Sequence, residues 1–257
     1  MPATLSVIVV AKNEAHDIAD CILSVKDFAL ETIVFDSGST DGTPELCRRL
    51  GATVVETDWP GDGPQKNRAL DTARGDWVLC LDADERASPA LRAEILAILR
   101  DGSPHTAFRM PRSSSFCGRF MKHSGWWPDY IVRLFKRGEG RFTPMLTHTR
   151  LDHRGTCGTL RGPVIHLAMP DVEEALDKMN SYSTSGAKML KAKGRRASMT
   201  GAAAHGLWMF FRTYVLKRGF LDGREGFMIA VLNAEASFHK YAKLALSDRR
   251  HGPDAAS

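Results

Sequence analysis

Two carboxylates, Asp82 and Asp84, directly follow a short apolar run at residues 77–81 and are the residues of this chain best suited to chemistry. The run predicts a buried strand, so both aspartates should emerge at its carboxyl end. Open α/β sheets bind their ligands at that end of the strands. Paired carboxylate oxygens there suit Mg2+ or Mn2+ holding a diphosphate. Because an Asp-x-Asp pair after a strand is more often a solvated turn, the prediction depends on the surrounding motifs.

Polar residues also follow the first two strands of the predicted sheet. Asn13 and Glu14 end the first apolar run, and a turn with two glycines and small polar residues spans residues 36–43. Such a turn can present backbone amides to a ligand. We expect Asp36, at the very end of its strand, to contact that ligand.

Residues 65–68, Gln-Lys-Asn-Arg, open a predicted helix before the strand that carries Asp82. Lys66 and Arg68 are candidates for contacting a phosphate, helped by the helix N-terminus. Three parallel strands would then bring polar groups to one sheet edge. Acidic and amide groups at that edge can bind a uracil and a ribose.

The elements that must position these residues alternate between strand and helix over the first hundred residues. Apolar periodicity predicts strands at 5–11, 32–35, 53–56 and 77–81, and helices at 15–28, 43–50, 64–73 and 89–99. Ser88 is a suitable N-cap for the last of these helices, with Pro89 at its first position. This alternation predicts an α/β fold with a Rossmann-like, mostly parallel central sheet flanked by helices.

The pattern changes after about residue 105. Short strands are predicted at 106–110, 131–136 and 164–166, and helices at 172–192, 202–218 and 225–246. We therefore expect an α/β domain at residues 1–170, a helical, basic extension at 171–250 and a frayed tail at 251–257.

Composition narrows the class of protein. The 257 residues are 43% hydrophobic and 25% charged, which is typical of a globular protein with a sizeable core. Five scattered cysteines without a Cys-x-x-Cys pair argue against a zinc site or a disulfide framework and favour reduced thiols in a cytosol. No apolar stretch approaches the roughly 20 residues that span a bilayer. Residues 5–11 are too short for a signal peptide and lack a basic leader.

These motifs, in this order and spacing, resemble the family 2 glycosyltransferases of the GT-A fold over roughly the first 110 residues. The strings that carry the resemblance are Asn13-Glu14, Asp36 to Thr43, Gln65 to Asn67 and Leu81 to Glu85. Lys66-Asn67, Leu81 to Glu85 and three further strings resemble the lipopolysaccharide-core branch, which includes a heptose β-1,4-glucosyltransferase. The three further strings are Trp126-Trp127-Pro128-Asp129, Arg133-Leu134-Phe135 and Tyr214 to Gly223.

The resemblance implies an inverting, metal-dependent transfer of a hexose, with glucose expected, from a UDP-sugar to a lipid-linked saccharide such as the lipopolysaccharide inner core. By position, Asp129 matches the family's catalytic base, which deprotonates the acceptor hydroxyl. Asp84 would bind Mg2+ or Mn2+, Asp82 would contact the ribose or the metal, and His166 would approach the metal or the diphosphate. The structural alternatives are that Asp129 is a loop residue among aromatics and that His166 is a buried structural histidine.

The resemblance also implies which residues contact substrates. Trp126 and Trp127 would stack on sugar rings, and Arg133 would lie by the diphosphate or the acceptor, unless it only forms a surface ion pair. The nucleotide sugar would contact a larger set: Ala11, Asn13, Glu14, Asp36, Gly38, Asp41, Lys66, Asn67, Asp82 and Ala83.

Two positions depart from the family pattern. Many relatives have an Asp-Asp doublet where this chain has Asp36-Ser37, so base recognition rests on Asp36 and Asp41. Relatives often carry His-Glu where this chain has His148-Thr149, which weakens any role for His148.

The segment from Lys178 to Leu221 contains nine Lys or Arg residues and no Asp or Glu, together with several aromatic residues. Basic residues beside an aromatic, amphipathic helix suit an anionic membrane surface. The plainer interpretation is a helix packed on the core with a solvated basic face. Nucleic acid is disfavoured because no reading motif is present. We expect a cytoplasmic protein, peripheral on the inner face of the cytoplasmic membrane, and make no prediction of its oligomeric state.

Three other functions compete with this one. A nucleotidyltransferase that makes a sugar nucleotide would share the sheet and the metal, but needs a Gly-rich, Arg-bearing loop where this chain has residues 11–14. A non-catalytic nucleotide-sugar sensor or membrane adaptor is disfavoured by the intact Asp82, Asp84 and Asp129. A polyprenyl-phosphate or other cell-envelope polysaccharide glycosyltransferase is a close variant, although many polyprenyl-phosphate enzymes add transmembrane helices.

Overall fold

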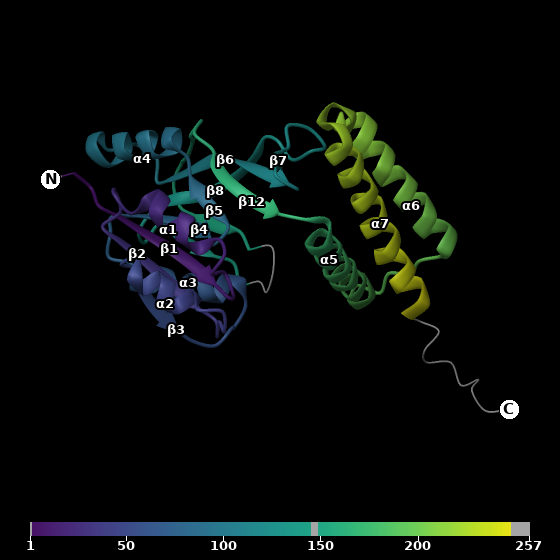
Figure 1. Ribbon diagram of the computed structural model, residues 1–257, viewed down its shortest axis with the longest axis horizontal. Coiled ribbons are helices and arrows are strands. Elements are labelled where there is room, and N and C mark those ends of the chain that lie inside the picture. Colours follow the sequence, from purple (N-terminus) through teal and green to yellow (C-terminus); the bar gives the residue numbers. More distant parts are fainter. Residues whose placement is uncertain (1, 145–148, 248–257) are drawn as a thin grey trace. The chain divides into compact units, whose positions relative to one another are not determined.

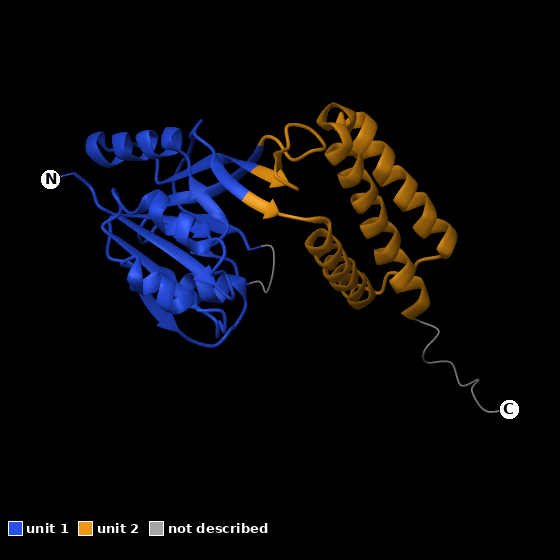
Figure 2. Cartoon of the chain, viewed as in Figure 1, with its two compact units in different colours: residues 1–113, 129–166 blue, residues 114–128, 167–257 orange. Residues whose placement is uncertain are grey.

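The computed structural model describes residues 2–144 and 149–247. Within them the chain forms two compact units, shown in different colours in Figure 2. Unit 1 comprises residues 1–113 and 129–166, and unit 2 comprises residues 114–128 and everything from residue 167 onward. Segment 114–128 thus clusters with the helical unit although it precedes the boundary at 170 expected from the sequence. The expected tail at 251–257 and His148 lie outside the described residues.

Unit 1 is an α/β sandwich whose helices flank a central sheet (Figure 1). Its first part runs β1 (Leu5–Ala11), α1 (Ile18–Val25), β2 (Glu31–Asp36), α2 (Thr43–Arg49), β3 (Thr53–Glu56), α3 (Asp62–Thr72), β4 (Trp77–Asp82), β5 (Glu85–Ala87) and α4 (Pro89–Asp101). Its second part contains most of β6 (Ala107–Phe116), then β8 (Asp129–Lys136), β9 (Gly140–Phe142), β10 (Leu151–His153), β11 (Cys157–Thr159) and the start of β12 (Val164–Met169).

The sheet confirms the predicted parallel core. Its order is β3-β2-β1-β4-β8-β6-β12-β5, and the first four strands are parallel. The register places Ala11 beside Asp36 and Val10 beside Asp82. The carboxyl ends of β1, β2 and β4 therefore lie next to one another, as the sequence predicts.

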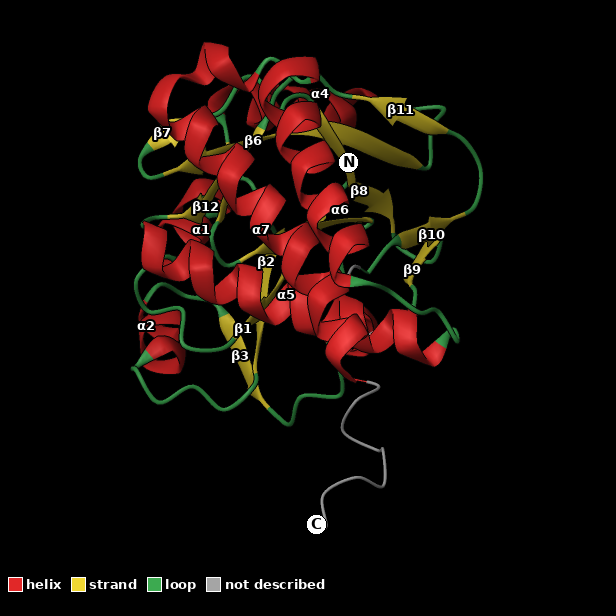
Figure 3. Ribbon diagram, turned by 90° about the vertical axis from the view of Figure 1, so that its right-hand side faces the viewer, coloured by secondary structure: helices red, strands yellow, loops and turns green. Residues whose placement is uncertain are grey.

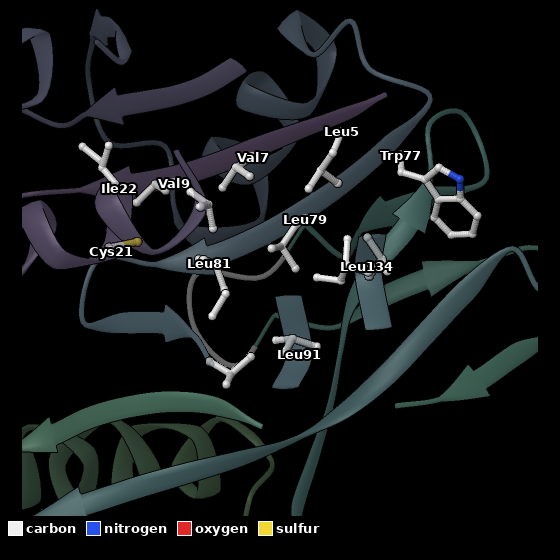
Figure 4. Close-up of a cluster of buried hydrophobic side chains, with 14 of the residues drawn as sticks. Leu5, Val7, Val9, Cys21, Ile22, Trp77, Leu79, Leu81, Leu91 and Leu134 are labelled. Carbon is white, nitrogen blue, oxygen red and sulfur yellow. The ribbon is translucent and has the colours of Figure 1, made fainter. Parts of the chain in front are cut away.

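Alternating apolar residues of β1 and β4 build a core on each face of the sheet. Val7, Val9, Leu79 and Leu81 are buried with α1 and α4 on one face, and several of these side chains are drawn in Figure 4. On the other face Ile8 and its neighbours pack with the small apolar residues of α3. Because both faces are covered, these strands are almost continuously apolar, as parallel strands usually are.

The structure differs from the predicted elements mainly in the later strands. β5, β7 (Arg119–Phe120), β9, β10 and β11 were not predicted, since strands of two or three residues leave no periodic signal. β6 is ten residues long instead of five because its polar continuation, residues 111–116, pairs with β7 and β8. The predicted N-cap is confirmed, since the Ser88 side chain accepts a hydrogen bond from the backbone N–H of Leu91.

Unit 2 is built around the helices α5 (Val172–Ala192), α6 (Met199–Phe211) and α7 (Gly223–Ser247), which are labelled in Figure 3. α7 packs against both α5 and α6. The helix predicted at 202–218 is in fact α6 followed by a π-helical turn, Arg212–Leu216, and a separate 3-10 turn, Gly219–Asp222. A small core that includes Phe116, Met121 and Ile229 joins segment 114–128 to the helices of this unit.

Candidate active site

The loops after β1 and β2 are joined by side-chain hydrogen bonds. The Asn13 side-chain oxygen accepts from the Thr40 backbone N–H at 2.8 Å, while the Asn13 N–H donates to the Ser39 hydroxyl at 2.7 Å. The Asp41 carboxylate accepts from the Ala15 N–H at 3.0 Å. These bonds fix the two loops as one edge of the site, and Asn13 itself adopts a left-handed backbone with φ 56°.

Asp36, the last residue of β2, is fully buried. One of its carboxylate oxygens accepts from the backbone N–H groups of Gly38 at 3.0 Å and Ser39 at 2.8 Å. Gly38 has φ 81°, a conformation that favours glycine. Asp36 therefore shapes the turn after β2, which is a structural task alongside the ligand contact expected from the sequence.

Asp82 lies between two buried cations at the end of β4. Its Oδ1 is 2.9 Å from Lys66 Nζ on α3, and its Oδ2 forms an ion pair with Arg133 of β8. Side chains alternate along a strand, so Asp82 points to the same face as Val78 and Cys80, where α3 packs. Burial raises the pKa of Asp82, but Arg133 and Lys66 outweigh burial and hold that pKa well below its usual range.

Glu85 is the buried centre of this charge network, with no exposed surface. Its carboxylate accepts from the Asp82 backbone N–H at 3.0 Å and lies 3.1 Å from Arg133 Nη2. Arg112 of β6 lies 3.5 Å from the same Glu85 oxygen. The guanidinium groups of Arg112 and Arg133 thus both lie near the Glu85 carboxylate. Their positive charge neutralises this buried carboxylate, which would be costly to bury without a partner.

Asp129, the candidate base, is held by Arg112. The Nε and Nη2 of Arg112 both donate to Asp129 Oδ2, at 3.0 and 2.7 Å. The two residues stand opposite each other in the register of β6 and β8. A single carboxylate oxygen takes both bonds, so Oδ1 is the oxygen left to accept a proton from a substrate.

Asp84 and His166 face each other across the end of the sheet. His166 Nε2 is 3.2 Å from Asp84 Oδ2, and His166 lies opposite Glu85 in the pairing of β12 with β5. Within residues 2–144 and 149–247, no three His, Cys, Asp or Glu side chains are grouped to hold a metal ion. Mg2+ is usually bound through one or two carboxylates and completes its shell with substrate phosphate and water. Asp84 can supply such a carboxylate, and His166 beside it is a second candidate ligand.

A cavity of about 710 Å3 opens in unit 1 beside this network. Its wall is formed by Asp62, Lys66, Asp82, Arg112, Tyr130, Ile131, Val132, Arg133, Phe142, Thr149, Arg150, Leu151 and His153. Five of these side chains are Lys, Arg or His and two are Asp. Its size is in the range of a small-molecule site, and its cationic wall favours an anionic ligand.

Several of the residues expected from the sequence have other surroundings. The Asn67 side chain exchanges two hydrogen bonds of 2.9 Å with the backbone of Phe142, which joins α3 to β9. Ala11 and Ala83 are buried in the core, so only their backbone is available to a ligand. Trp126 packs edge-on against Phe116 inside unit 2, whereas Trp127 is exposed.

Arg112 and Glu85 are the residues of the network that sequence reasoning did not assign. Arg112 contacts Asp129 only because β6 pairs with β8, and no local sequence pattern predicts that pairing. Glu85 had a signal, since a carboxylate that directly follows the Asp-x-Asp pair was already part of the motif. Its complete burial appears only in the folded chain.

Comparison with known proteins identifies the family. The family model for glycosyl transferase family 2 matches residues 6–159, more than half of the chain. The chain belongs to glycosyltransferase family 2. Accordingly it is a transferase, and unit 1 has the α/β fold with a parallel core sheet flanked by helices that the sequence predicts.

Individual relatives extend over almost the whole chain. An uncharacterized glycosyltransferase of Rickettsia prowazekii is 30% identical over 93% of this chain and 86% of its own length. The lipopolysaccharide core biosynthesis glycosyltransferase LpsC of Rhizobium meliloti is 29% identical over 98% of this chain and 97% of its own. Among solved structures, glucosyl-3-phosphoglycerate synthase of Mycobacterium tuberculosis in complex with Mn2+ and UDP-glucose is 30% identical over 42% of this chain and 43% of that one, with a TM-score of 0.37.

Proposed function

We propose that this glycosyltransferase moves a hexose, with glucose the first candidate, from a UDP-sugar to a hydroxyl of a lipid-linked saccharide, with inversion at the anomeric carbon. The observation that carries the proposal is the arrangement at the end of β4. There Asp84 faces His166 at 3.2 Å, and Asp82 is paired with Lys66 and Arg133 beside a cationic cavity. Donor, metal and base then have adjacent places on one sheet edge, which is where α/β folds bind ligands.

In this proposal the uridine lies against the joined loops after β1 and β2, and Asp41 and Asn13 contribute to its recognition. Asp84 and His166 would hold Mn2+ or Mg2+, which when bound neutralises charge on the diphosphate. Lys66 and Arg133 are buried cations and would add positive charge next to the same diphosphate. Their pairing with Asp82 fixes their positions before the donor arrives, which is the preorganisation that electrostatic catalysis needs.

The chemical step needs one base. The acceptor hydroxyl gives its proton to Asp129 Oδ1 while its oxygen forms a bond to the anomeric carbon. The bond from that carbon to the β-phosphate oxygen breaks, and the electron pair leaves with UDP. Attack from the side opposite the leaving group inverts the configuration.

The lipid-linked acceptor and the membrane location rest on other support. LpsC, similar to this chain along its whole length, is by its name an enzyme of lipopolysaccharide core biosynthesis. The basic, aromatic segment 178–221 suits a bilayer that carries such an acceptor. None of the helices in the described part of the chain has the length and apolar composition needed to cross a bilayer. We therefore propose peripheral attachment to the cytoplasmic face of the inner membrane.

Metal-dependent donor binding tests the Asp84 assignment. UDP should raise the melting temperature in the presence of Mn2+ and raise it much less without it, since a ligand that binds only the native state stabilises it. Asp84→Ala should remove the Mn2+-dependent part, while Asp101→Ala, an exposed aspartate at the end of α4, should keep it. Unchanged Mn2+-dependent binding by Asp84→Ala would refute this assignment. A folded, Mn2+-loaded sample that binds no UDP compound in calorimetry would refute the donor proposal as a whole.

Asp129→Asn tests the base. The amide keeps the shape of the side chain but cannot accept the hydroxyl proton, and a general base contributes about 10^2 to 10^4 in rate. Transfer to acceptor should fall by that factor while Mn2+-dependent UDP binding survives. Normal turnover by this variant would remove Asp129 from the mechanism.

A further inference from the structure

The end of α6 and the turns after it carry an exposed apolar surface in unit 2. Leu207, Trp208, Phe211 and Val215 are each at least 42% exposed, and their spacing places them on one side of the helical segment. Leu216, at the end of the π-helical turn, and Phe220 and Leu221, in the 3-10 turn that follows, are 50 to 55% exposed. We call these seven residues the apolar ridge. Large contiguous apolar surfaces are uncommon on proteins that do not bind a partner through them.

The ridge is held by a rigid turn. Asp222 is almost fully buried and accepts hydrogen bonds from the backbone N–H groups of Lys122 at 3.2 Å and His123 at 2.9 Å. Gly219 and Gly226 allow the 3-10 turn to lie directly on α7, because a Cβ at Gly226 would collide with the Gly219 carbonyl. The string Leu-Lys-Arg-Gly-Phe-Leu-Asp-Gly thus serves as an anchored turn that presents Leu216, Phe220 and Leu221.

The charges around the ridge are positive and unpaired. Arg212, Lys217 and Arg218 are exposed, and no described acidic side chain forms an ion pair with them. The two acidic residues nearby in the chain are already engaged. Asp222 is buried, and Glu225 pairs with Arg224 at 2.6 Å and with Arg119 at 3.5 Å. The ridge therefore needs a partner that is apolar at its centre and negative around it.

We propose that the apolar ridge inserts into the interface of an anionic phospholipid bilayer, with Arg212, Lys217 and Arg218 on the headgroups. A bilayer interface offers an apolar layer below a negative one, and aromatic and leucine side chains beside basic residues match that order. A second copy of the chain would bring the same positive charges to the contact and repel it. The inference deepens the membrane location given under the proposed function, but the binding itself requires no substrate.

The test is sedimentation of the full chain with phosphatidylcholine vesicles that contain or lack phosphatidylglycerol. The chain should pellet with the anionic vesicles, and raising NaCl to about 0.5 M should release it, since the Debye length falls to a few ångström. The double change Lys217→Gln, Arg218→Gln should weaken binding about 30-fold. Each basic residue near an anionic surface contributes about 1 kcal/mol, and about 1.4 kcal/mol corresponds to a tenfold change in affinity. The double change Leu216→Ser, Leu221→Ser should lower binding at least as far.

A matched control uses two leucines of unit 1 that are equally exposed. Leu23 is 51% and Leu30 is 55% exposed, against 55% for Leu216 and 50% for Leu221. The change Leu23→Ser, Leu30→Ser should leave vesicle binding unchanged. Equal loss in both pairs, or equal binding to neutral and anionic vesicles, would overturn the proposal. So would a concentration-dependent dimer in analytical ultracentrifugation that the Leu216→Ser, Leu221→Ser change abolishes.

Calorimetry with UDP and Mn2+ separates this proposal from the proposed function. A ridge variant that loses vesicle binding but keeps UDP binding is folded and supports the ridge. If the wild-type protein binds vesicles but no UDP compound, the donor proposal is refuted and the membrane-binding proposal for the ridge stands. Wild-type protein that binds UDP but ignores anionic vesicles overturns the ridge and leaves the donor assignment intact.

Discussion

Three buried charged residues of unit 1 are paired with opposite charges, whereas, in the described part of the chain, the exposed basic residues around the apolar ridge of unit 2 are not. In unit 1, Lys66, Arg133 and Glu85 are buried and each lies within 3.1 Å of an oppositely charged partner. In unit 2, the basic residues around the apolar ridge are exposed and have no acidic partner among the described residues. Buried charges need partners because desolvation is costly, whereas exposed charges are stable alone and remain available to an external ligand.

Under the proposed function, this contrast corresponds to two tasks within one chain. Paired, buried charges would hold catalytic groups in fixed positions before a substrate binds. Unpaired, exposed charges attract a surface of opposite sign and are sensitive to salt. If the contrast is correct, changes to the buried basic residues of unit 1 should reduce stability, and changes to the exposed basic residues around the ridge should reduce binding to anionic surfaces.

The largest effect is expected from Arg133→Met. The change leaves Asp82 and Glu85 with fewer positive partners inside the protein, and breaking a buried ion pair costs about 3–5 kcal/mol. Denaturant unfolding should show that loss in the free energy of unfolding. Arg196→Met in the exposed basic segment of unit 2 is the matched control and should change stability by less than about 0.5 kcal/mol. Equal effects of the two changes would contradict the contrast.

An intermediate effect is expected from Gly226→Ala, which tests the rigid turn of unit 2. The added methyl collides with the Gly219 carbonyl, so α7 and the turn must separate, at about 1–3 kcal/mol. Gly186→Ala on α5 is the control, because its methyl meets only the flexible side chain of Lys240. That change should be neutral, or stabilising by up to about 1 kcal/mol through helix propensity. Thermal melting of both variants compares them, and a silent Gly226→Ala would argue against close packing of the turn.

The smallest effect is expected from Glu31→Gln at the start of β2. Burial raises the pKa of Glu31, but hydrogen bonds from Ser6 and Arg74 outweigh burial and lower it. A carboxylate with a lowered folded pKa stabilises the protein above its unfolded pKa of about 4.3. That stability is lost as the pH falls through the folded pKa. The variant should therefore be less stable by about 1 kcal/mol at pH 7 and equal to wild type in strong acid.

Urea unfolding as a function of pH measures this difference. The gap between wild type and Glu31→Gln should begin to narrow near the unfolded pKa of about 4.3 and should close as the pH falls through the lower folded pKa, where the folded carboxyl also takes up its proton. A constant gap down to strong acid would mean that the lost stability comes from shape and not from charge.

Much of the fold followed from the sequence because its signals are local. β1 and β4 are continuous apolar runs, and Ser88-Pro89 is a local start signal for α4. α5 begins at Val172, as predicted, and Asp171 is its N-cap, with a side chain that accepts from the Glu174 N–H. The break of the 202–218 helix could not be predicted in this way. It depends on where Gly219 meets Gly226, residues that are brought together by the packing of the turn on α7.

In the candidate site, too, local sequence signals predicted some features, whereas others depended on how distant strands pair. The sequence by itself determined that Asp36, Asp82 and Asp84 emerge at one carboxyl edge of the sheet, because parallel strands after apolar runs share that edge. Only the tertiary structure decided which charges neutralise which. Arg112 reaches Asp129, and Arg133 reaches Asp82 and Glu85, through the pairing of β8 with β4 and β6. Electrostatic pairing depends on distance in space, and strand partners far apart in sequence set that distance.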